Sequence, residues 1–146
     1  MPEELEANVL LVDDEEKFVE VLAQRMKTRG LKVDTSMSGE DAVKHAKDKD
    51  LDAIVLDLQM PGMSGLEALK KIKQENPDLQ IIILTGHGTV QAGIEAMKEG
   101  AMDFLEKPVD LSALLEKIKE AKQKRVLVIQ KKHEEHVKEI MQTRSW

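Results

Sequence analysis

The chain has 146 residues, of which 41% are hydrophobic and 34% charged, a size and composition that suit one folded domain plus one additional element. It contains no cysteine, which excludes disulfides, thiolate metal sites and cysteine nucleophiles. The net charge of −6 divides into 15 Lys and Arg against 25 Asp and Glu in residues 1–121, and 7 against 3 in residues 122–146, and so acidic a body argues against direct binding of DNA or RNA.

Apolar runs of strand length alternate five times along the chain with amphipathic stretches of helical length. The runs are Val9–Val12, Lys32–Ser36, Ala53–Leu56, Ile81–Leu84 and Asp103–Leu105. The helical stretches are Glu15–Arg29, Ser38–Asp48, Ser64–Gln74, about Thr89–Glu99, and a final one that begins at Asp110. Strand–helix alternation of this kind predicts a parallel sheet with helices on both faces.

Several helix boundaries carry recognisable end signals. Gly30 and Gly100 follow the first and fourth helical stretches, as glycine often does at a helix C-terminus. Ser64 and Glu67 fit a capping box, in which the serine side chain and the glutamate satisfy free backbone N–H groups. Asp110 is expected to cap the N-terminus of the last helix.

The strand order follows from which runs are apolar throughout. The first, third and fourth runs are apolar without alternation, as expected for central strands buried on both faces, whereas the second and fifth carry charge and are expected at the edges. The order 2-1-3-4-5 meets this requirement and defines a doubly wound, flavodoxin-like α/β fold. In such a sheet, ligands bind in a crevice beyond the carboxyl ends of strands one and three.

Charged side chains stand at the carboxyl ends of three predicted strands. Asp13 and Asp14 follow the first strand, Asp57 follows the third, and Lys107 follows the fifth. Clustered carboxylates repel one another unless a cation intervenes, and oxygen ligands without histidine suit Mg²⁺. A carboxylate can also act as the nucleophile in phosphoryl transfer, for which a metal and a lysine neutralise the charge of the transferred group. The crevice is therefore predicted to support magnesium-dependent phosphoryl transfer, with one carboxylate left as the nucleophile and Lys107 as the second positive group.

With these residues in view, the chain resembles the receiver domains of bacterial two-component response regulators, in particular those of the nitrogen-regulatory type. The resemblance covers about residues 7–121, which we take as the domain, with residues 122–146 as a helical extension. It is carried by Asp13-Asp14, by Asp57 ahead of Met60-Pro61-Gly62, by Thr85-Gly86-His87-Gly88, by Gly100–Phe104 and by Lys107-Pro108.

The resemblance implies a phosphoacceptor site. Asp57 would accept phosphate from a histidine kinase or a phosphotransfer protein. Mg²⁺ would be held by Asp13, Asp14, Asp57 and the backbone carbonyl of Gln59. Lys107 would contact the phosphoryl group, and the bond between Lys107 and Pro108 would be cis.

The resemblance also implies a switch. The Thr85 hydroxyl would move to the new phosphate, and Phe104 would rotate inward to fill the space that it leaves. Seen alone, Thr85 and Phe104 would be an ordinary strand residue and an edge-strand core contact. Gln59 and His87 occupy positions where receivers tune the access of water to the acyl phosphate, although an exposed loop side chain is the alternative for both.

The extension is helix-friendly and lacks Gly and Pro. It would add about 25 residues, some ~35 Å of helix. Five positions approximate a 3-4 spacing with a polar middle, which weakly specifies a two-stranded coiled coil: Val126, Ile129, His133, His136 and Ile140. We expect a homodimer through this helix or through the surface of the fourth strand, fourth helix and fifth strand, although a solvated helix is the alternative. The two histidines lack the spacing of a zincin motif.

Two other functions remain open. The chain could be the receiver fragment of a longer transcriptional regulator, because nitrogen-regulatory receivers usually precede an ATPase and a DNA-binding domain, neither of which this sequence contains. A magnesium-dependent phosphohydrolase is less favoured, because haloacid-dehalogenase-type enzymes carry Asp-x-Asp after strand one. We expect a signalling switch rather than an enzyme. The acidic N-terminus and the absence of a long uncharged stretch predict a cytoplasmic protein without membrane contact.

Overall fold

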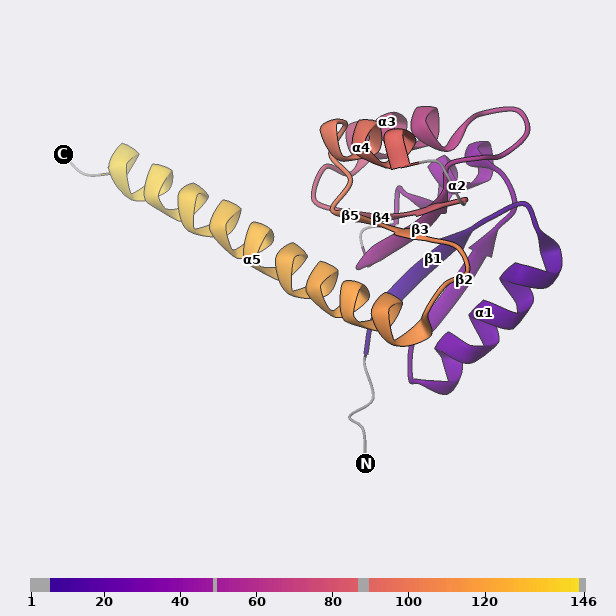
Figure 1. The fold of residues 1–146 in the computed structure, drawn as a ribbon. Helices are drawn as coiled ribbons and strands as arrows, with labels where there is room; N and C mark the ends of the chain where they lie inside the picture. The colour runs from indigo at the N-terminus through magenta and orange to yellow at the C-terminus, as the bar shows by residue number, and fades with distance from the viewer. Residues whose placement is uncertain (1–5, 49, 87–89, 145–146) are drawn as a thin grey trace.

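A computed structural model describes residues 6–48, 50–86 and 90–144 and places a parallel sheet between two layers of helices (Figure 1). The strands are β1 (Asn8–Val12), β2 (Lys32–Ser36), β3 (Ala53–Asp57), β4 (Gln80–Thr85) and β5 (Asp103–Glu106). The helices are α1 (Glu16–Thr28), α2 (Gly39–His45), α3 (Gly65–Glu75), α4 (Val90–Lys98) and α5 (Leu111–Arg144). The order β2-β1-β3-β4-β5 confirms the predicted order, with β2 and β5 at the edges.

The three central strands separate two apolar cores. Side chains that alternate along β1, such as Leu10 and Leu11, point to opposite faces because successive residues of a strand do so. Leu10 belongs to the core under α2, α3 and α4, and Leu11 to the core under α1 and α5 (Figure 1). Every residue of β3 and β4 is buried. Burial on both faces explains why the sequences of β3 and β4 are apolar without interruption.

Most element ends agree with the sequence prediction to within about one residue. The Ser64 hydroxyl oxygen accepts a hydrogen bond from the Glu67 N–H at 3.2 Å, and Asp110 Oδ1 accepts one from the Ser112 N–H at 3.2 Å, as the capping signals predict. The prediction for the second helix was too long, because α2 ends at His45 rather than Asp48. The chain turns there, with the Asp48 N–H donating to the carbonyl of His45 at 3.0 Å, to return to the sheet.

The last helix leaves the body of the molecule as a single rod. α5 runs without a break past residue 121 and projects well beyond the sheet (Figure 1). Residues 122–144 are called the extension from here on. Among the described residues, no helix is both long and apolar enough to cross a membrane.

The base of the extension is tied to the amino-terminal edge of the sheet. The Arg125 guanidinium donates to Asp52 Oδ1 at 3.0 Å, and Asp52 Oδ2 accepts the Asn8 N–H at 2.9 Å. Lys132 pairs with Asp78 at 2.5 Å. Because Arg125 and Asp52 are both mostly shielded from solvent, their ion pair is less screened than a surface pair and holds the direction of the helix.

Replacing Arg125 by Ala should loosen this attachment. Among the described residues, the Asp52 carboxylate would keep its hydrogen bond from the Asn8 N–H but lose its cationic partner, and we expect a loss of roughly 1–3 kcal/mol in the free energy of unfolding. Amide exchange over residues 122–132 should accelerate, as measured by mass spectrometry. Lys131→Ala is the matched control, since it removes an exposed cation from the same helix and should change stability by less than about 0.5 kcal/mol. If Arg125→Ala and Lys131→Ala changed stability and amide exchange equally, the Arg125–Asp52 ion pair would not hold the extension.

Candidate functional site

Three carboxylates and one ammonium meet at the carboxyl edge of the sheet. Asp13 and Asp14 lie directly after β1, Asp57 ends β3, and Lys107 follows β5. Oxygen atoms from the three carboxylates lie within 4.8 Å of one another. Asp13 and Asp57 are buried and Asp14 is exposed, so the carboxylate site, defined as these three residues, has a buried floor and an open side.

The Lys107 ammonium connects two of these carboxylates. Its Nζ donates to Asp13 Oδ2 at 2.7 Å and lies 3.6 Å from Asp57 Oδ2. Glu15 Oε1 is 3.9 Å away. Burial by itself would lower the pKa of Lys107, but its hydrogen bond to Asp13 and the charges of Asp57 and Glu15 raise it, so the side chain stays cationic. The peptide bond between Lys107 and Pro108 is cis.

The carboxyl group of Asp57 has a raised pKa. Burial, and secondly the negative charge of Asp13, raise its pKa from 3.8 to about 6. The Gln59 N–H, which donates to Asp57 Oδ1 at 3.3 Å, and the Lys107 ammonium act in the opposite direction. With all three carboxylates ionised, one ammonium cannot balance their charge. A further cation is therefore favoured at this position.

The donor set fits Mg²⁺. All its side-chain ligands are carboxylate oxygens, which this hard ion prefers, and the exposed Asp14 side leaves room for the waters that Mg²⁺ usually keeps. Bound there, the ion would supply positive charge next to the Asp57 carboxylate.

The loop after Asp57 is shaped by a glycine at the start of α3. A Cβ atom on Gly65 would lie 2.3 Å from the Asp57 carbonyl oxygen and 2.4 Å from Leu58 Cα. The Gly65 N–H donates to the Leu58 carbonyl at 3.0 Å. No other residue fits so close to the backbone, and this contact fixes the direction in which the chain leaves Asp57.

Thr85 ends β4, directly after Leu84, which pairs with Asp57, and Phe104 lies on the neighbouring strand β5. The Thr85 hydroxyl donates to the Leu105 carbonyl oxygen at 3.4 Å, a long hydrogen bond. The half-buried Phe104 ring packs against Gly93 of α4, where a Cβ atom would lie 3.0 Å from two ring carbons. The sequence analysis did not single out Gly93, because a glycine inside a helix gives no direct sign of what packs on it.

The structure describes only some of the remaining candidate residues. The Gln59 side chain is exposed. His87 lies outside the described residues. Phe18 was missed altogether: its ring centroid lies 4.5 Å from Lys107 Nζ. Its only signal in the sequence is the scarcity of aromatic residues, which make up 2% of the chain.

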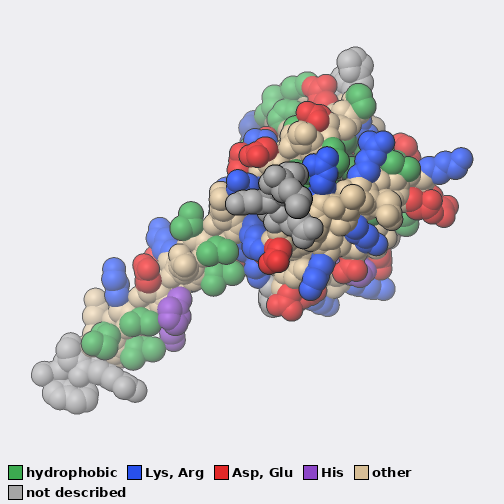
Figure 2. Space-filling view, turned by 90° about the horizontal axis from the view of Figure 1, so that it is seen from below, with side chains coloured by type: hydrophobic (Ala, Val, Ile, Leu, Met, Phe, Trp, Pro, Cys, Tyr) green, Lys and Arg blue, Asp and Glu red, His purple; other side chains and the backbone are tan. Residues whose placement is uncertain are grey.

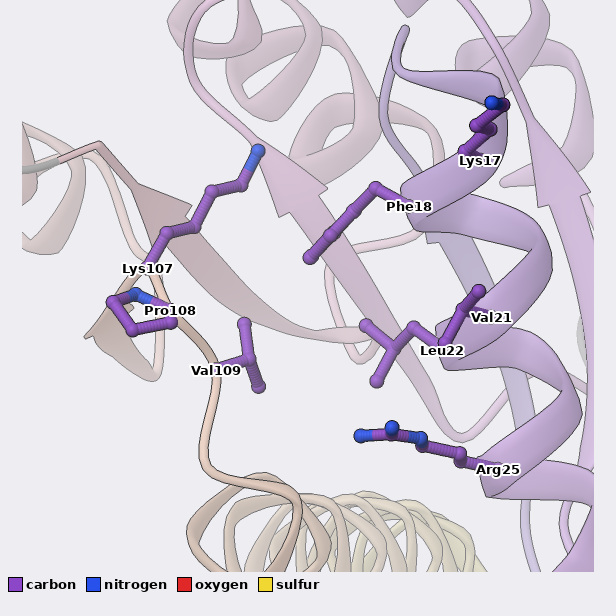
Figure 3. A pocket seen from close by; sticks show the side chains of 8 residues that line it. All are labelled: Lys17, Phe18, Val21, Leu22, Arg25, Lys107, Pro108 and Val109. Carbon is purple, nitrogen blue, oxygen red and sulfur yellow. The ribbon is translucent and has the colours of Figure 1, made fainter.

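A groove opens beside Lys107, between α1 and the segment after β5 (Figure 3). Its volume is about 600 Å³. The walls are mainly apolar and come from Phe18, Val21 and Leu22 on one side and from Pro108 and Val109 on the other. We call it the α1 groove.

Comparison with known proteins gives consistent matches. The model of the response regulator receiver domain family matches residues 9–119. The C4-dicarboxylate transport transcriptional regulatory protein DctD of Pseudomonas aeruginosa is 38% identical over 130 residues, which are 88% of this chain and 28% of that protein.

Solved structures agree. A response regulator receiver domain protein from Clostridium thermocellum is 33% identical, with a TM-score of 0.80 over 84% of this chain and 98% of that one. NtrX from Brucella abortus, crystallised with ADP, is 27% identical, with a TM-score of 0.80 over 86% of this chain and 29% of that one. The chain thus spans less than a third of the length of DctD and of the NtrX chain.

The raised pKa of Asp57 predicts a pH-dependent cost in stability. A folded-state pKa of about 6 against 3.8 means that the native state binds the proton more tightly than the unfolded chain. The stabilisation that the protonated Asp57 carboxyl gives to the folded state is fully present below pH 3.8 and is lost as the pH rises through about 6. Without magnesium, Asp57→Asn should therefore stabilise the protein by roughly 1–3 kcal/mol at pH 8 and by about half as much at pH 5.

Urea unfolding at both pH values measures this difference. Asp34→Asn, which neutralises an exposed carboxylate on β2, is the control and should change stability by less than about 0.5 kcal/mol at either pH. An Asp57→Asn variant that is less stable than the parent at pH 8 would contradict the claim that the ionised Asp57 carboxylate destabilises the folded state.

The contact of Gly93 with Phe104 predicts a reversal of sign in a double-mutant cycle. Gly93→Ala should cost roughly 1–3 kcal/mol, because the new methyl group meets the ring. In a Phe104→Ala background the same change should stabilise by about 0.5–1 kcal/mol, since Ala favours a helix over Gly. Chemical denaturation of the four proteins gives both values. A gain in both backgrounds would show that the ring does not rest on Gly93.

Proposed function

Because the chain belongs to the response regulator receiver domain family, we propose that it accepts a phosphoryl group on Asp57 from a histidine kinase or a phosphotransfer protein. One observation carries the proposal: the Lys107 ammonium lies 3.6 Å from Asp57 and 2.7 Å from Asp13. A cation and a buried carboxylate are thus already in place where a phosphoryl group would arrive.

The transfer needs few groups from the protein. An ionised oxygen of Asp57 forms a bond to phosphorus while the bond from phosphorus to the imidazole nitrogen of the donor breaks, and the electron pair of that bond stays on the imidazole. Asp57 must be ionised to attack, and its pKa near 6 leaves it mostly ionised at neutral pH. Lys107 would leave Asp13 for the incoming phosphoryl oxygens, whose charge it would neutralise.

The magnesium ligands in this proposal are Asp13, Asp14, Asp57 and the backbone carbonyl of Gln59. Mg²⁺ would balance the negative charge that the phosphoryl group brings. The nearness of the three carboxylates supports this assignment. The exposed Gln59 side chain could then control how readily water reaches the acyl phosphate, and His87 is proposed for the same role from sequence alone.

Thr85 and Phe104 are proposed as the switch. The long hydrogen bond from Thr85 to Leu105 is weak enough to be exchanged for a charge-assisted one to a phosphoryl oxygen. Movement of the Thr85 hydroxyl would free space next to Phe104, whose ring packs on α4. A single covalent charge would in this way change the surface of α4 and β5.

Signalling rather than enzymatic turnover is the proposed role. The α1 groove, which borders Lys107, suits an apolar helix face of the kinase or phosphotransfer protein.

A receiver fragment of a longer transcriptional regulator is supported by the partial coverage of DctD and NtrX. In such a protein, contact with nucleic acid would come from other domains.

Phosphorylation is tested with acetyl phosphate and Mg²⁺. We expect intact-mass spectra to show one added phosphoryl group, peptide mapping to place it on Asp57, and Asp57→Asn and chelation of the metal to abolish it. A magnesium-dependent phosphohydrolase acting through Asp13 would behave differently. It would turn over phosphate monoesters rapidly, lose this activity in Asp13→Asn and keep it in Asp57→Asn, and that result would overturn the proposal.

Homodimerisation through the extension is the proposed output. Its exposed apolar residues include Val126, Ile129, Val137 and Ile140, which helical spacing puts on one side. Figure 2 shows hydrophobic side chains gathered along this helix, with histidine next to them. Such a stripe favours helix pairing, and the exposed Val90 and Ile94 of α4 offer a second surface for the same purpose.

Light scattering on a sizing column tests the dimer. With Mg²⁺, beryllofluoride as a phosphoryl mimic should double the mass. Ile140→Lys, which places a charge in the stripe, should keep the protein monomeric, whereas Glu135→Lys on the opposite face of the helix should not. A mass that the mimic leaves unchanged would remove self-association as the output.

A further inference from the structure

Of the two phenylalanines of the chain, Phe18 lies against a residue of the site, the Lys107 ammonium. The sequence contains two Phe, one Trp and no Tyr. Phe104 belongs to the proposed switch, whereas nothing so far gives a role to Phe18. It is the third residue of α1 and half-buried, and its ring faces the Lys107 ammonium across one end of the α1 groove (Figure 3).

The geometry suits a cation–π contact. Lys107 Nζ lies 4.5 Å from the ring centroid, within the range of about 6 Å in which such contacts attract. The Lys107 side chain is four-fifths shielded from solvent, which strengthens the attraction. The Lys107 ammonium donates one hydrogen bond to Asp13 at 2.7 Å, and the Phe18 ring covers the ammonium on the groove side.

A lysine side chain has four rotatable bonds, so its ammonium needs neighbours on more than one side to stay in place. Asp13 and Asp57 provide these on the sheet side. Phe18 provides a neighbour that attracts the cation but offers no hydrogen-bond acceptor. The ammonium therefore stays near the carboxylate site without losing its capacity to donate to a new anion.

We infer that Phe18 is a positioning residue for Lys107: the ring face holds the ammonium at the carboxylate site. The expected effect on labelling of Asp57 rests on the proposed phosphoacceptor function.

The test compares side chains that keep or lack an aromatic face. Phe18→Leu keeps an apolar side chain but lacks the ring, and Phe18→Tyr keeps the ring. Val21→Ala is the matched control, because Val21 lines the same groove farther along α1 from Lys107 (Figure 3). Circular dichroism melts establish that each variant folds, and Phe18→Met, which also lacks the ring, replaces the Leu variant if that one unfolds.

The first readout is spectroscopic and independent of phosphorylation. In the magnesium-free protein, ring current from Phe18 should displace the NMR signals of the protons on Lys107 Cε. We expect this displacement to persist in Phe18→Tyr and Val21→Ala and to vanish in Phe18→Leu. If the Leu variant keeps the displacement, the ring does not hold the ammonium and the inference is wrong.

The second readout is the initial rate at which acetyl phosphate labels Asp57 in the presence of Mg²⁺. Phe18→Leu should slow labelling roughly three- to tenfold, the range that a cation–π contact supports, while Phe18→Tyr stays within about twofold of the parent. Equal slowing by Leu and Tyr would mean that shape matters rather than the ring face, which contradicts the inference. If the parent protein itself is not labelled, the proposed function fails, and the Lys107 signals still decide the role of Phe18.

Discussion

One lysine ammonium surrounded by acidic side chains is the constraint on which the rest of the site depends. Asp13 and Asp57 are both buried, and their charges would drive them apart without Lys107. The parallel sheet brings the three together because their strands all end at the same edge. Even so the balance is incomplete: the pKa of Asp57 remains raised to about 6, and the site still favours a further cation. Both proposed roles of the site, binding of Mg²⁺ and transfer of a phosphoryl group to Asp57, depend on this charge imbalance.

The proposed input, switch and output lie on three different parts of the molecule. Phe18 and the α1 groove connect Lys107 with α1, where a phosphoryl donor would be seated. Phe104 of the proposed switch packs against Gly93 of α4. The opposite edge of the sheet carries the extension, held by Arg125 and Asp52. Input, switch and output would therefore use different elements around one shared sheet.

The fold could be predicted from the sequence because its signals are local. Runs such as Ile81–Leu84 are apolar throughout, and this alone identifies a central strand of a parallel sheet. The site could be located because strand ends converge at one edge, which topology dictates. Phe18, Gly65 and Gly93 could not be assigned roles, because each acts through a contact with a residue distant in sequence or through backbone approach. The Arg125–Asp52 ion pair escaped prediction for the same reason, since 73 positions separate its members.

The most direct test of the central claim is a crystal structure of the protein with Mg²⁺ and beryllofluoride. We expect beryllium bonded to an oxygen of Asp57, the metal held by Asp13, Asp14 and Asp57, and Lys107 Nζ turned from Asp13 to a fluorine atom. The Thr85 hydroxyl should have left the Leu105 carbonyl for a second fluorine. Beryllofluoride on Asp13, or an Asp57 that stays unmodified while Lys107 remains on Asp13, would contradict the account.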